Sequence, residues 1–430
     1  MITIAAILLL VLALLGAPLF VVVIGGAALG FLSQATDLSV LHIDIYQLSS
    51  SVVLMALPLF TFVGYVLSEA KTGDRLIRLS QAAFGWMPGG FAFVTLVACA
   101  GFTALTGGSG VTIVALGALL LPALKKLGYN DRFSLGLVTS SGSLGLLLAP
   151  SVPLLIYGIV AQQMSQSIPG MPPVQINDLY IAGILPSILM IALLYLWCVW
   201  ATRHDAVPKQ AFSFSELKSA LWDMRYELPL PFVVLGGIFS GFLVISEAAA
   251  ITALYVLIVE MFLYKEVTFK ALPRVTRESM VMVGGLLLIL GCAMALTDYI
   301  VYAGIPDRFF ELVQQYVSSK VGFLILLNIF LLIAGAALDI FPALIILIPL
   351  ILPVALRYGI DPVHLGIIFV ANMQIAYIVP PIGMNLFIAS YRFKRKVSEI
   401  MRASWSFMLV LIVALLLITY VPSLSLWLLH

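Results

Sequence analysis

Charged side chains are scarce in this sequence. Asp, Glu, Lys and Arg make up 10% of its 430 residues, whereas 62% of the residues are hydrophobic. Soluble globular domains carry about 25% charged residues, so this composition excludes a water-soluble globular protein. The net charge of +2 gives no indication of a nucleic-acid partner.

Cysteine and histidine are also scarce. The three cysteines stand singly in apolar runs, without a C-x-x-C pair, so we expect packing residues and neither a disulfide nor a metal site: Cys99, Cys198 and Cys292. The four histidines are scattered and lack the spacing of metal ligands: His42, His204, His364 and His430. His364, beside the "GIDP" turn, is predicted to lie in a loop.

Catalytic and nucleotide-binding motifs are missing as well. The stretch "GGSG" at 107–110 resembles part of the G-x-S-x-G nucleophile motif, but position 111 is Val and no His–Asp pair accompanies it. The same glycines do not end in Lys-Ser or Lys-Thr, so they form no P-loop. We therefore predict no catalytic residue, and no ATP use by this chain.

Long apolar runs fill the sequence from end to end. A membrane span needs about 20 apolar residues, and runs of that order recur at 2–32, 51–70, 91–105, 179–201, 228–264, 279–302, 321–356, 363–391 and 404–427. The first run lacks a positively charged start and a clear cleavage site, so we interpret it as a retained helix rather than a signal peptide. The prediction is an all-α polytopic membrane protein with about ten to twelve crossings.

Basic residues gather in a few loops, around 71–78, 125–132, 203–225, 265–277 and 392–402, and are rare at 33–50, 162–178 and 297–307. The positive-inside rule places the basic loops in the cytoplasm. One of them, 203–227, contains "ELKSALWDMRYELP" with Trp222 and Tyr226. It is either an amphipathic helix at the membrane interface or a solvated linker.

The two halves of the chain repeat one pattern. "LGLVTSSGSLGLLLAPSVPLLIYG" from Leu135 aligns with "LGIIFVANMQIAYIVPPIGMNLFI" from Leu365, and Pro150 then coincides with Pro380. Upstream, "LPALKKLGY" (121–129) matches "LPVALRYGI" (352–360), and "TALTGGSGVT" (103–112) occupies the place of "GAALDIFPAL" (335–344). In each half we therefore predict an interrupted segment, a return marked by proline, a Gly turn and then a helix broken in its middle.

A broken helix at membrane depth exposes free backbone carbonyls from one half and N–H groups from the other. It is tolerated only where protein or a watery cavity satisfies those groups. Carbonyls suit Na⁺, and helix N-termini suit a carboxylate. Paired breaks in corresponding positions of two halves indicate a secondary transporter with its site at the bilayer midplane, although a single proline can also be a mere kink.

The blocks "LTGGSGVTIVALGALLLPALKKLGY", "SSGSLGLLLAPSVPLLIYG", "ISEAAAITALY" and "ALDIFPALIILIPLILPVALRYGIDPVHLGIIFVANMQIAYIVPPIGMNLFIAS" resemble the large membrane subunit of TRAP (tripartite ATP-independent periplasmic) transporters. The resemblance spans nearly the whole chain. It implies inverted repeats with two re-entrant hairpins and two broken helices, arranged as transport and scaffold domains of an elevator in the bacterial inner membrane. It also implies Na⁺ coupling, an organic acid as solute, a small four-helix membrane subunit and a periplasmic binding protein as partners.

The resemblance also places the site residues. Substrate contacts are expected at Ser109, Thr112, Ser151 and Asn385. One Na⁺ site is expected at Gly108, Ser109 and Ser143 with nearby backbone, and a second at Gly335, Asp339, Asn372 and Gln374. The helix breaks are expected at Pro150, Pro153, Pro380 and Pro381. Many family members have Pro-Pro at the first break, where this chain has Ala149-Pro150, so the turn there depends on Pro150.

The predicted organisation has six parts: scaffold helices at 1–80, a first transport repeat at 81–200, a cytoplasmic amphipathic linker at 201–230, scaffold helices at 228–302, a second transport repeat at 303–395, and a C-terminal helix at 396–430.

Several alternatives stay open. Asp339 is either a cation ligand or an interfacial loop acid, and Asn372 and Gln374 either line the site or bond between helices. Glu247 is expected near a helix N-terminus. The alternative function is a stand-alone Na⁺/carboxylate symporter of a related hairpin-containing fold; a channel subunit and an intramembrane enzyme are further candidates, the last without sequence support. C4-dicarboxylates, sialic acids, keto acids and sulfonates all suit recognition by helix ends.

Overall fold

The computed structural model describes residues 7–9, 11, 12, 15, 17–34, 36–39, 46, 52–168, 171–203, 211–380 and 383–429. This part of the chain is all-helical and contains no strand. The helices of its first half are α2 (Leu19–Ser33), η1 (Val52–Met55), α4 (Ala56–Glu69), α5 (Thr72–Phe84), α6 (Gly90–Thr106), α7 (Ser109–Lys126), α8 (Asp131–Ser141), η2 (Leu144–Leu147), α9 (Val152–Ser167), α10 (Ile176–Ala182) and α11 (Ile184–Ala201).

The second half continues with α12 (Phe214–Asp223), α13 (Pro229–Phe239), α14 (Ile245–Ile258), the π-helical turn η3 (Val259–Leu263), α15 (Leu272–Tyr302), α16 (Ile305–Tyr316), α17 (Lys320–Ala337), α18 (Ile340–Arg357), α19 (Pro362–Ala376), α20 (Met384–Phe393), α21 (Val397–Tyr420) and α22 (Ser423–Leu426). Eight helical stretches of the described chain are long and apolar enough to cross a membrane, and five shorter apolar helices accompany them.

The local sequence explains where the repeated helices begin. Gly128 and Gly359 both have positive φ, 88° and 68°, and end the helices before them. Two residues later, Asn130 accepts a hydrogen bond from the backbone N–H of Arg132 (2.9 Å). Asp361 likewise accepts from the N–H of Val363 (2.8 Å). The two halves therefore start their broken helices, α8 and α19, with the same kind of N-cap.

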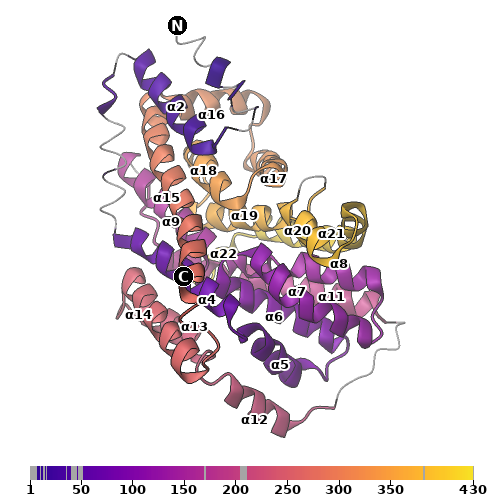
Figure 1. Cartoon of the computed structure of the whole chain (residues 1–430). Coiled ribbons are helices and arrows are strands. Elements are labelled where there is room, and N and C mark those ends of the chain that lie inside the picture. The colour runs from indigo at the N-terminus through magenta and orange to yellow at the C-terminus, as the bar shows by residue number, and fades with distance from the viewer. Residues whose placement is uncertain are drawn as a thin grey trace.

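The helices form two groups. The outer group consists of α2, α4, α13, α14 and α15, in which α15 packs on α2 and α4, and α14 on α4 and α13. The hairpin group consists of α6 to α11 and α17 to α22. In Figure 1, α13 and α14 lie at the lower left, and α7, α8, α11, α20 and α21 lie at the right. The groups meet where α4 contacts α6 and α9, and where α15 contacts α18.

Packing inside the hairpin group is the same for both repeats. The first arm of each hairpin packs on the first half of the following broken helix, α6 on α8 and α17 on α19. The second arm of each hairpin packs on the second half of the other repeat's broken helix, α7 on α20 and α18 on α9. The breaks of the two repeats are thereby brought together in one core.

Helix α5 is tied to the outer group by a buried charged cluster. Arg75 forms salt bridges with Glu227 (2.7 Å) and Glu266 (2.8 Å), and its guanidinium lies 3.6 Å from Glu260. The side chain of Glu227 is 1% exposed and that of Arg75 is 11% exposed. Burial alone disfavours the charge of Arg75, but hydrogen bonds and charges of Glu227 and Glu266 outweigh it and raise the pKa of the guanidinium. We conclude that this cluster fixes the N-terminal end of α5 to the outer group.

Two expectations outside the site can be compared with the structure. The linker contains the helix α12, which packs on α5 and carries an exposed Trp222.

His364 is not in a loop, and that prediction was wrong. It lies in the first turn of α19, is 2% exposed, and contacts Ser425 Oγ (3.2 Å) and the carbonyl oxygen of Thr419 (3.3 Å). Asp361-Pro362 starts a helix here because aspartate caps it and proline suits its first turn.

Glu247 lies in the first turn of α14 and accepts a hydrogen bond from the backbone N–H of Val244 (3.2 Å), which confirms the expected position at a helix N-terminus. The three cysteines are buried and free, as expected of packing residues.

Candidate functional site

The first break lies between α8 and α9 and contains the short helix η2 and Pro150. Ser151 caps α9: its hydroxyl accepts from the N–H of Leu154 (3.4 Å) and donates to the carbonyl oxygen of Leu146. Gly145 packs on the backbone of α6, where a Cβ would lie 2.1 Å from the carbonyl oxygen of Ala100. A side chain at this position would push the break off α6, so glycine is required for the close approach. Pro153 lies in the first turn of α9, where proline is tolerated.

The second break lies between α19 and α20. Pro380 is in its turn, and Pro381 lies outside the described residues. The N–H of Asn385 donates to the carbonyl oxygen of Tyr377 (3.0 Å) across the break. Gly335 on α17 packs on this turn's entrance, where a Cβ would lie 2.7 Å from the Cβ of Ala376. Gly335 therefore allows the hairpin arm to approach the break closely.

The tip of the first hairpin is formed by Gly107, with φ 69°, and Gly108. Below the tip, the hydroxyls of Thr103 and Thr112 lie 2.7 Å apart, and Thr103 donates to the carbonyl oxygen of Gly142 (2.8 Å). Thr103 thus connects both arms of the hairpin to the first break. The expected substrate contacts Thr112 and Ser151 use their hydroxyls in these internal hydrogen bonds.

The tip of the first hairpin also meets the second break. The hydroxyl of Ser109 donates to Oδ1 of Asn385 at 2.9 Å, although 276 positions separate the two residues. Both side chains are buried, and Nδ2 of Asn385 has no acceptor within the described part of the chain. Ser109 begins α7 and Asn385 lies in the first turn of α20. Two helix N-termini and a free amide donor therefore converge, an arrangement that favours an anion.

The tip of the second hairpin contacts the same break. Asp339 directly precedes α18 and accepts a hydrogen bond from the hydroxyl of Tyr377 (2.6 Å). The N–H of Ile340 donates to that hydroxyl oxygen (3.4 Å). The tip falls at 338–339, inside the stretch 335–344 that occupies the place of the first tip in the repeat. A carboxylate with only one side-chain donor can still ligate a cation.

The two breaks contact each other directly. The hydroxyl of Ser143 donates to the backbone carbonyl oxygen of Gln374 at 2.9 Å. Ser143 follows α8 and Gln374 lies in the last turn of α19. This hydrogen bond places the first break beside the second in the core of the hairpin group.

Asn372 and Gln374 leave α19 on opposite sides, because positions two apart on a helix differ by about 200°. Nδ2 of Asn372 donates to Oδ1 of Asn328 on α17 (2.7 Å), and the amide nitrogen of Gln374 faces Met190 on α11. The side-chain oxygens of both residues are buried and accept no hydrogen bond from the described residues. Each is a free oxygen ligand, but the structure does not bring them together.

Two residues of this network were missed in the sequence. Thr103 stands three residues before Thr106 in "TALTGG", and Tyr377 precedes the prolines in "AYIVPP". A hydroxyl directly beside each predicted break was the available signal.

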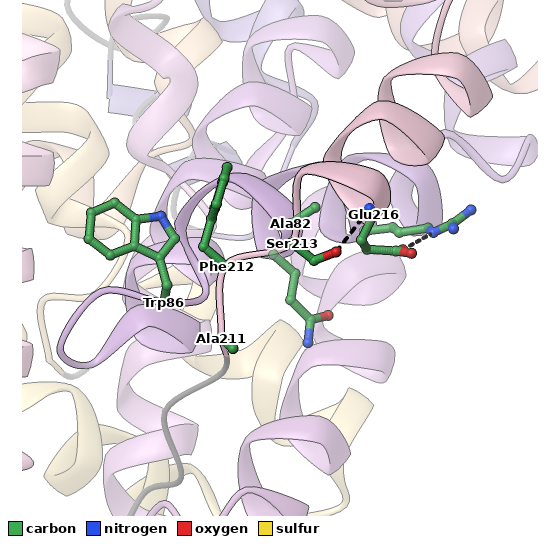
Figure 2. A pocket seen from close by; sticks show the side chains of 8 residues that line it. Ala82, Trp86, Ala211, Phe212, Ser213 and Glu216 are labelled. Atoms are coloured by element: carbon green, nitrogen blue, oxygen red, sulfur yellow. Dashed lines mark hydrogen bonds and ion pairs between the residues drawn. The ribbon is translucent and has the colours of Figure 1, made fainter.

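A cavity of about 260 Å³ lies elsewhere, between α5 and the chain that leads into α12. It is lined by Arg78, Gln81, Ala82, Trp86, Ala211, Phe212, Ser213 and Glu216, and Figure 2 shows Trp86 and Phe212 on one side and Glu216 on the other. None of the expected site residues lines it. Among the described residues, no group of three or more His, Cys, Asp or Glu side chains is arranged to hold a metal ion.

Comparison with known proteins identifies the family. The family model described as "Tripartite ATP-independent periplasmic transporter, DctM component" matches residues 4–424. This chain belongs to the DctM family. It is 35% identical over 378 residues to the C4-dicarboxylate TRAP transporter large permease protein DctM of Rhodobacter capsulatus, covering 87% of this chain and 86% of the relative. It is thus a TRAP transporter permease, a multi-pass protein of the bacterial inner membrane, and not an enzyme.

Two further comparisons are informative. The isethionate TRAP transporter permease protein DctMQ of Oleidesulfovibrio alaskensis is 29% identical over 408 residues, which are 94% of this chain and 62% of that relative. The crystal structure of the YdaH transporter from Alcanivorax borkumensis superposes with a TM-score of 0.63 at 16% identity, covering 88% of this chain and 86% of that one. The latter likeness shows an all-helical, multi-span transporter fold.

Proposed function

We propose that this DctM-family permease imports an organic acid, driven by Na⁺ and delivered by a periplasmic binding protein. A C4-dicarboxylate is our first choice of solute, because the Rhodobacter relative is named for it. The isethionate relative is named for a sulfonate, and sialic acids and keto acids carry the same kind of anionic group. The permease would pair with a small four-helix membrane subunit; the relative named DctMQ, longer than this chain, supports this pairing.

The contact between Ser109 and Asn385 carries the proposal. It joins the N-terminal ends of α7 and α20, and the buried Nδ2 of Asn385 is free to donate to a carboxylate. Free N–H groups at two helix ends add partial positive charge at the same place. Thr112 and Ser151 would contact the solute by giving up their internal hydrogen bonds and donating their hydroxyls to the solute instead.

Sodium ions would bind beside the solute. The first site would use Gly108, Ser109 and Ser143, where backbone carbonyls of the first hairpin tip and first break are available. The second would use Gly335, Asp339 and one of the two amides, Asn372 or Gln374. Support comes from the carboxylate of Asp339 at the second tip and from the unbonded, buried oxygens of Asn372 and Gln374. Because the two amides leave α19 on opposite sides, one ion can take only one of them, and Asn372, which faces α17 and thus the helix of Gly335, is the one we assign to it.

The transport motion would be that of an elevator. The hairpin group would form the transport domain, with its repeats at 81–200 and 303–395, and the outer group would form the scaffold, at 1–80 and 228–302. The linker 201–230 would lie on the cytoplasmic side, and the C-terminal helix at 396–430 would move with the hairpins. The equivalent packing of α7 on α20 and of α18 on α9 supports two repeats related by inversion.

Uptake into proteoliposomes tests this function. The chain is reconstituted with its small subunit, and radiolabelled succinate is supplied together with the binding protein and an inward Na⁺ gradient. We expect uptake that requires both. Equal uptake without the binding protein would instead support the stand-alone Na⁺/carboxylate symporter, and flux that needs no cation gradient would support a channel.

A further inference from the structure

Helix α4 approaches the tip of the first hairpin at Gly64. A Cβ placed on Gly64 would lie 2.6 Å from both the Cα and the carbonyl oxygen of Thr106, and 2.9 Å from its carbonyl carbon. Ordinary van der Waals contacts of a Cβ begin at 3.4 Å. The two backbones can therefore lie this close only because position 64 has no side chain.

The conformation of α4 does not itself require glycine. Gly64 lies in the interior of the helix Ala56–Glu69 and is not among the glycines with positive φ. Alanine would be the better residue for the helix alone, because it has the higher helix propensity. Glycine at position 64 instead leaves room for the backbone of the hairpin to approach α4.

The tip is also close to the end of the first break. Gly107 follows Thr106, and a Cβ on it would lie 2.8 Å from Cγ2 of Val152 at the start of α9. The side chain of Thr106 is only 5% exposed. The tip is thus buried and packs closely on both α4 and the end of the first break.

The surface around this contact is apolar and incompletely packed. A small cavity lies beside it, lined from the outer group chiefly by Phe60, Val63 and Leu67 on α4, and from the hairpin group by Leu105 and Pro150. Apolar contacts are non-directional, so one group can move along the other without breaking hydrogen bonds at these side chains. Steric fit then decides where the movement stops.

We propose that Gly64 sets one end position of the hairpin group on the outer group. The group stops where the Thr106 backbone lies on Gly64, and a side chain at position 64 excludes that position. Gly64 is thus a positioning residue of the transport cycle. The inference rests on the proposed elevator motion, but it concerns only where that motion ends.

Cross-linking in membranes tests the proposal. In the full chain with Cys99, Cys198 and Cys292 replaced by alanine, new cysteines at Val63 and Leu105 are joined by a short, reducible bifunctional thiol reagent. We expect Gly64→Ala to lower the cross-linked fraction about tenfold, as overpacking by a methyl shifts a two-state population. Thr106→Ala added to it should not restore the cross-link, because the overlapping atoms belong to the backbone.

The matched control is Gly236→Ala on α13, where an added Cβ meets nothing within 4 Å. This variant should cross-link like its parent. Equal cross-linking of the Gly64→Ala and Gly236→Ala proteins in membranes would overturn the proposal, provided that both proteins are monodisperse when extracted in detergent.

A second measurement needs no substitution at Gly64. Cross-linking the Val63 and Leu105 cysteines should stop succinate uptake in the reconstituted complex, and reduction of the linker should restore it. Uptake that continues in fully cross-linked protein would overturn the role of this contact. Absence of uptake in the parent before cross-linking would instead refute the proposed function itself.

Discussion

Truncation of Asn385 removes the side-chain donor that we assign to the carboxylate of the solute. In the structure this side chain is fully buried, its Oδ1 accepts from Ser109, and its Nδ2 has no acceptor among the described residues. The backbone N–H of residue 385 bonds to Tyr377, so Asn385→Ala keeps the turn while it removes the amide. The substitution therefore separates solute binding from the shape of the break.

The size of the effect follows from the charge of the solute. A hydrogen bond to a charged group contributes about 1.5–3 kcal/mol. Since about 1.4 kcal/mol corresponds to a tenfold change in affinity, Asn385→Ala should raise the half-saturating concentration of succinate about 10- to 100-fold. Ser109→Ala removes the donor to Oδ1 and leaves a buried acceptor unsatisfied, which costs about 1–3 kcal/mol in the closed tip.

The assay is a concentration series of succinate uptake into proteoliposomes at fixed Na⁺. Ser187→Ala is the matched control, because Ser187 is also buried and its hydroxyl, among the residues that the structure describes, bonds to Gly183 of its own helical segment (2.8 Å). Thermal unfolding in detergent checks that each variant is folded. A folded Asn385→Ala protein with the half-saturating concentration of the parent would refute the assignment of Asn385 to the solute.

Three further outcomes are expected. Asp339→Asn keeps an acceptor for Tyr377 but loses the charge, so half-maximal uptake should need about tenfold more Na⁺; unchanged Na⁺ activation would remove Asp339 from the site. Pro150→Ala should lower uptake more than expression, because α9 would lose its fixed start; normal kinetics would indicate a mere kink. Arg75→Ala leaves Glu227 buried without its cation and should destabilise the protein by about 3–5 kcal/mol in thermal unfolding; adding Glu227→Gln should recover part of the loss, and an unchanged midpoint would contradict the cluster's role.

The interrupted helices were predictable from the sequence because their signals are local. Pro150 and Pro380 each follow an apolar run that contains polar residues, Ser143 and Asn372 among them. Exposing such residues to lipid is unfavourable, so they indicate a segment buried in protein. The helix boundaries follow from the glycines and N-caps near 130 and 361. A repeat adds weight to such signals, since the same order occurs twice.

The contacts between the repeats could not be predicted in this way. Nothing local in "GGSG" or "GMNLF" indicates that Ser109 donates to Asn385, because that pairing depends on how α7 packs on α20. The prediction that His364 lies in a loop was wrong for a related reason. Its burial depends on Thr419 and Ser425 near the end of the chain, while the preceding "GIDP" resembles a simple turn.

The two hairpin tips share one backbone plan but differ in chemistry. Gly108 and Asp339 each stand directly before the second arm of their hairpin. At the first tip, glycine leaves the N-terminus of α7 open, and the nearby side chains offer a hydroxyl and a free amide. At the second tip, a carboxylate occupies the same place and neutralises the end of α18. We infer that the repeat positions two equivalent turns and that this single difference places the anionic group of the solute at the first turn, beside the first Na⁺ site, and leaves the second turn to a cation alone. Exchange of the two residues, Gly108→Asp with Asp339→Gly, should then abolish succinate uptake. Of the single exchanges, Gly108→Asp should raise the half-saturating succinate, because it places a negative charge beside the solute, whereas Asp339→Gly should raise the half-saturating Na⁺ and leave the half-saturating succinate unchanged.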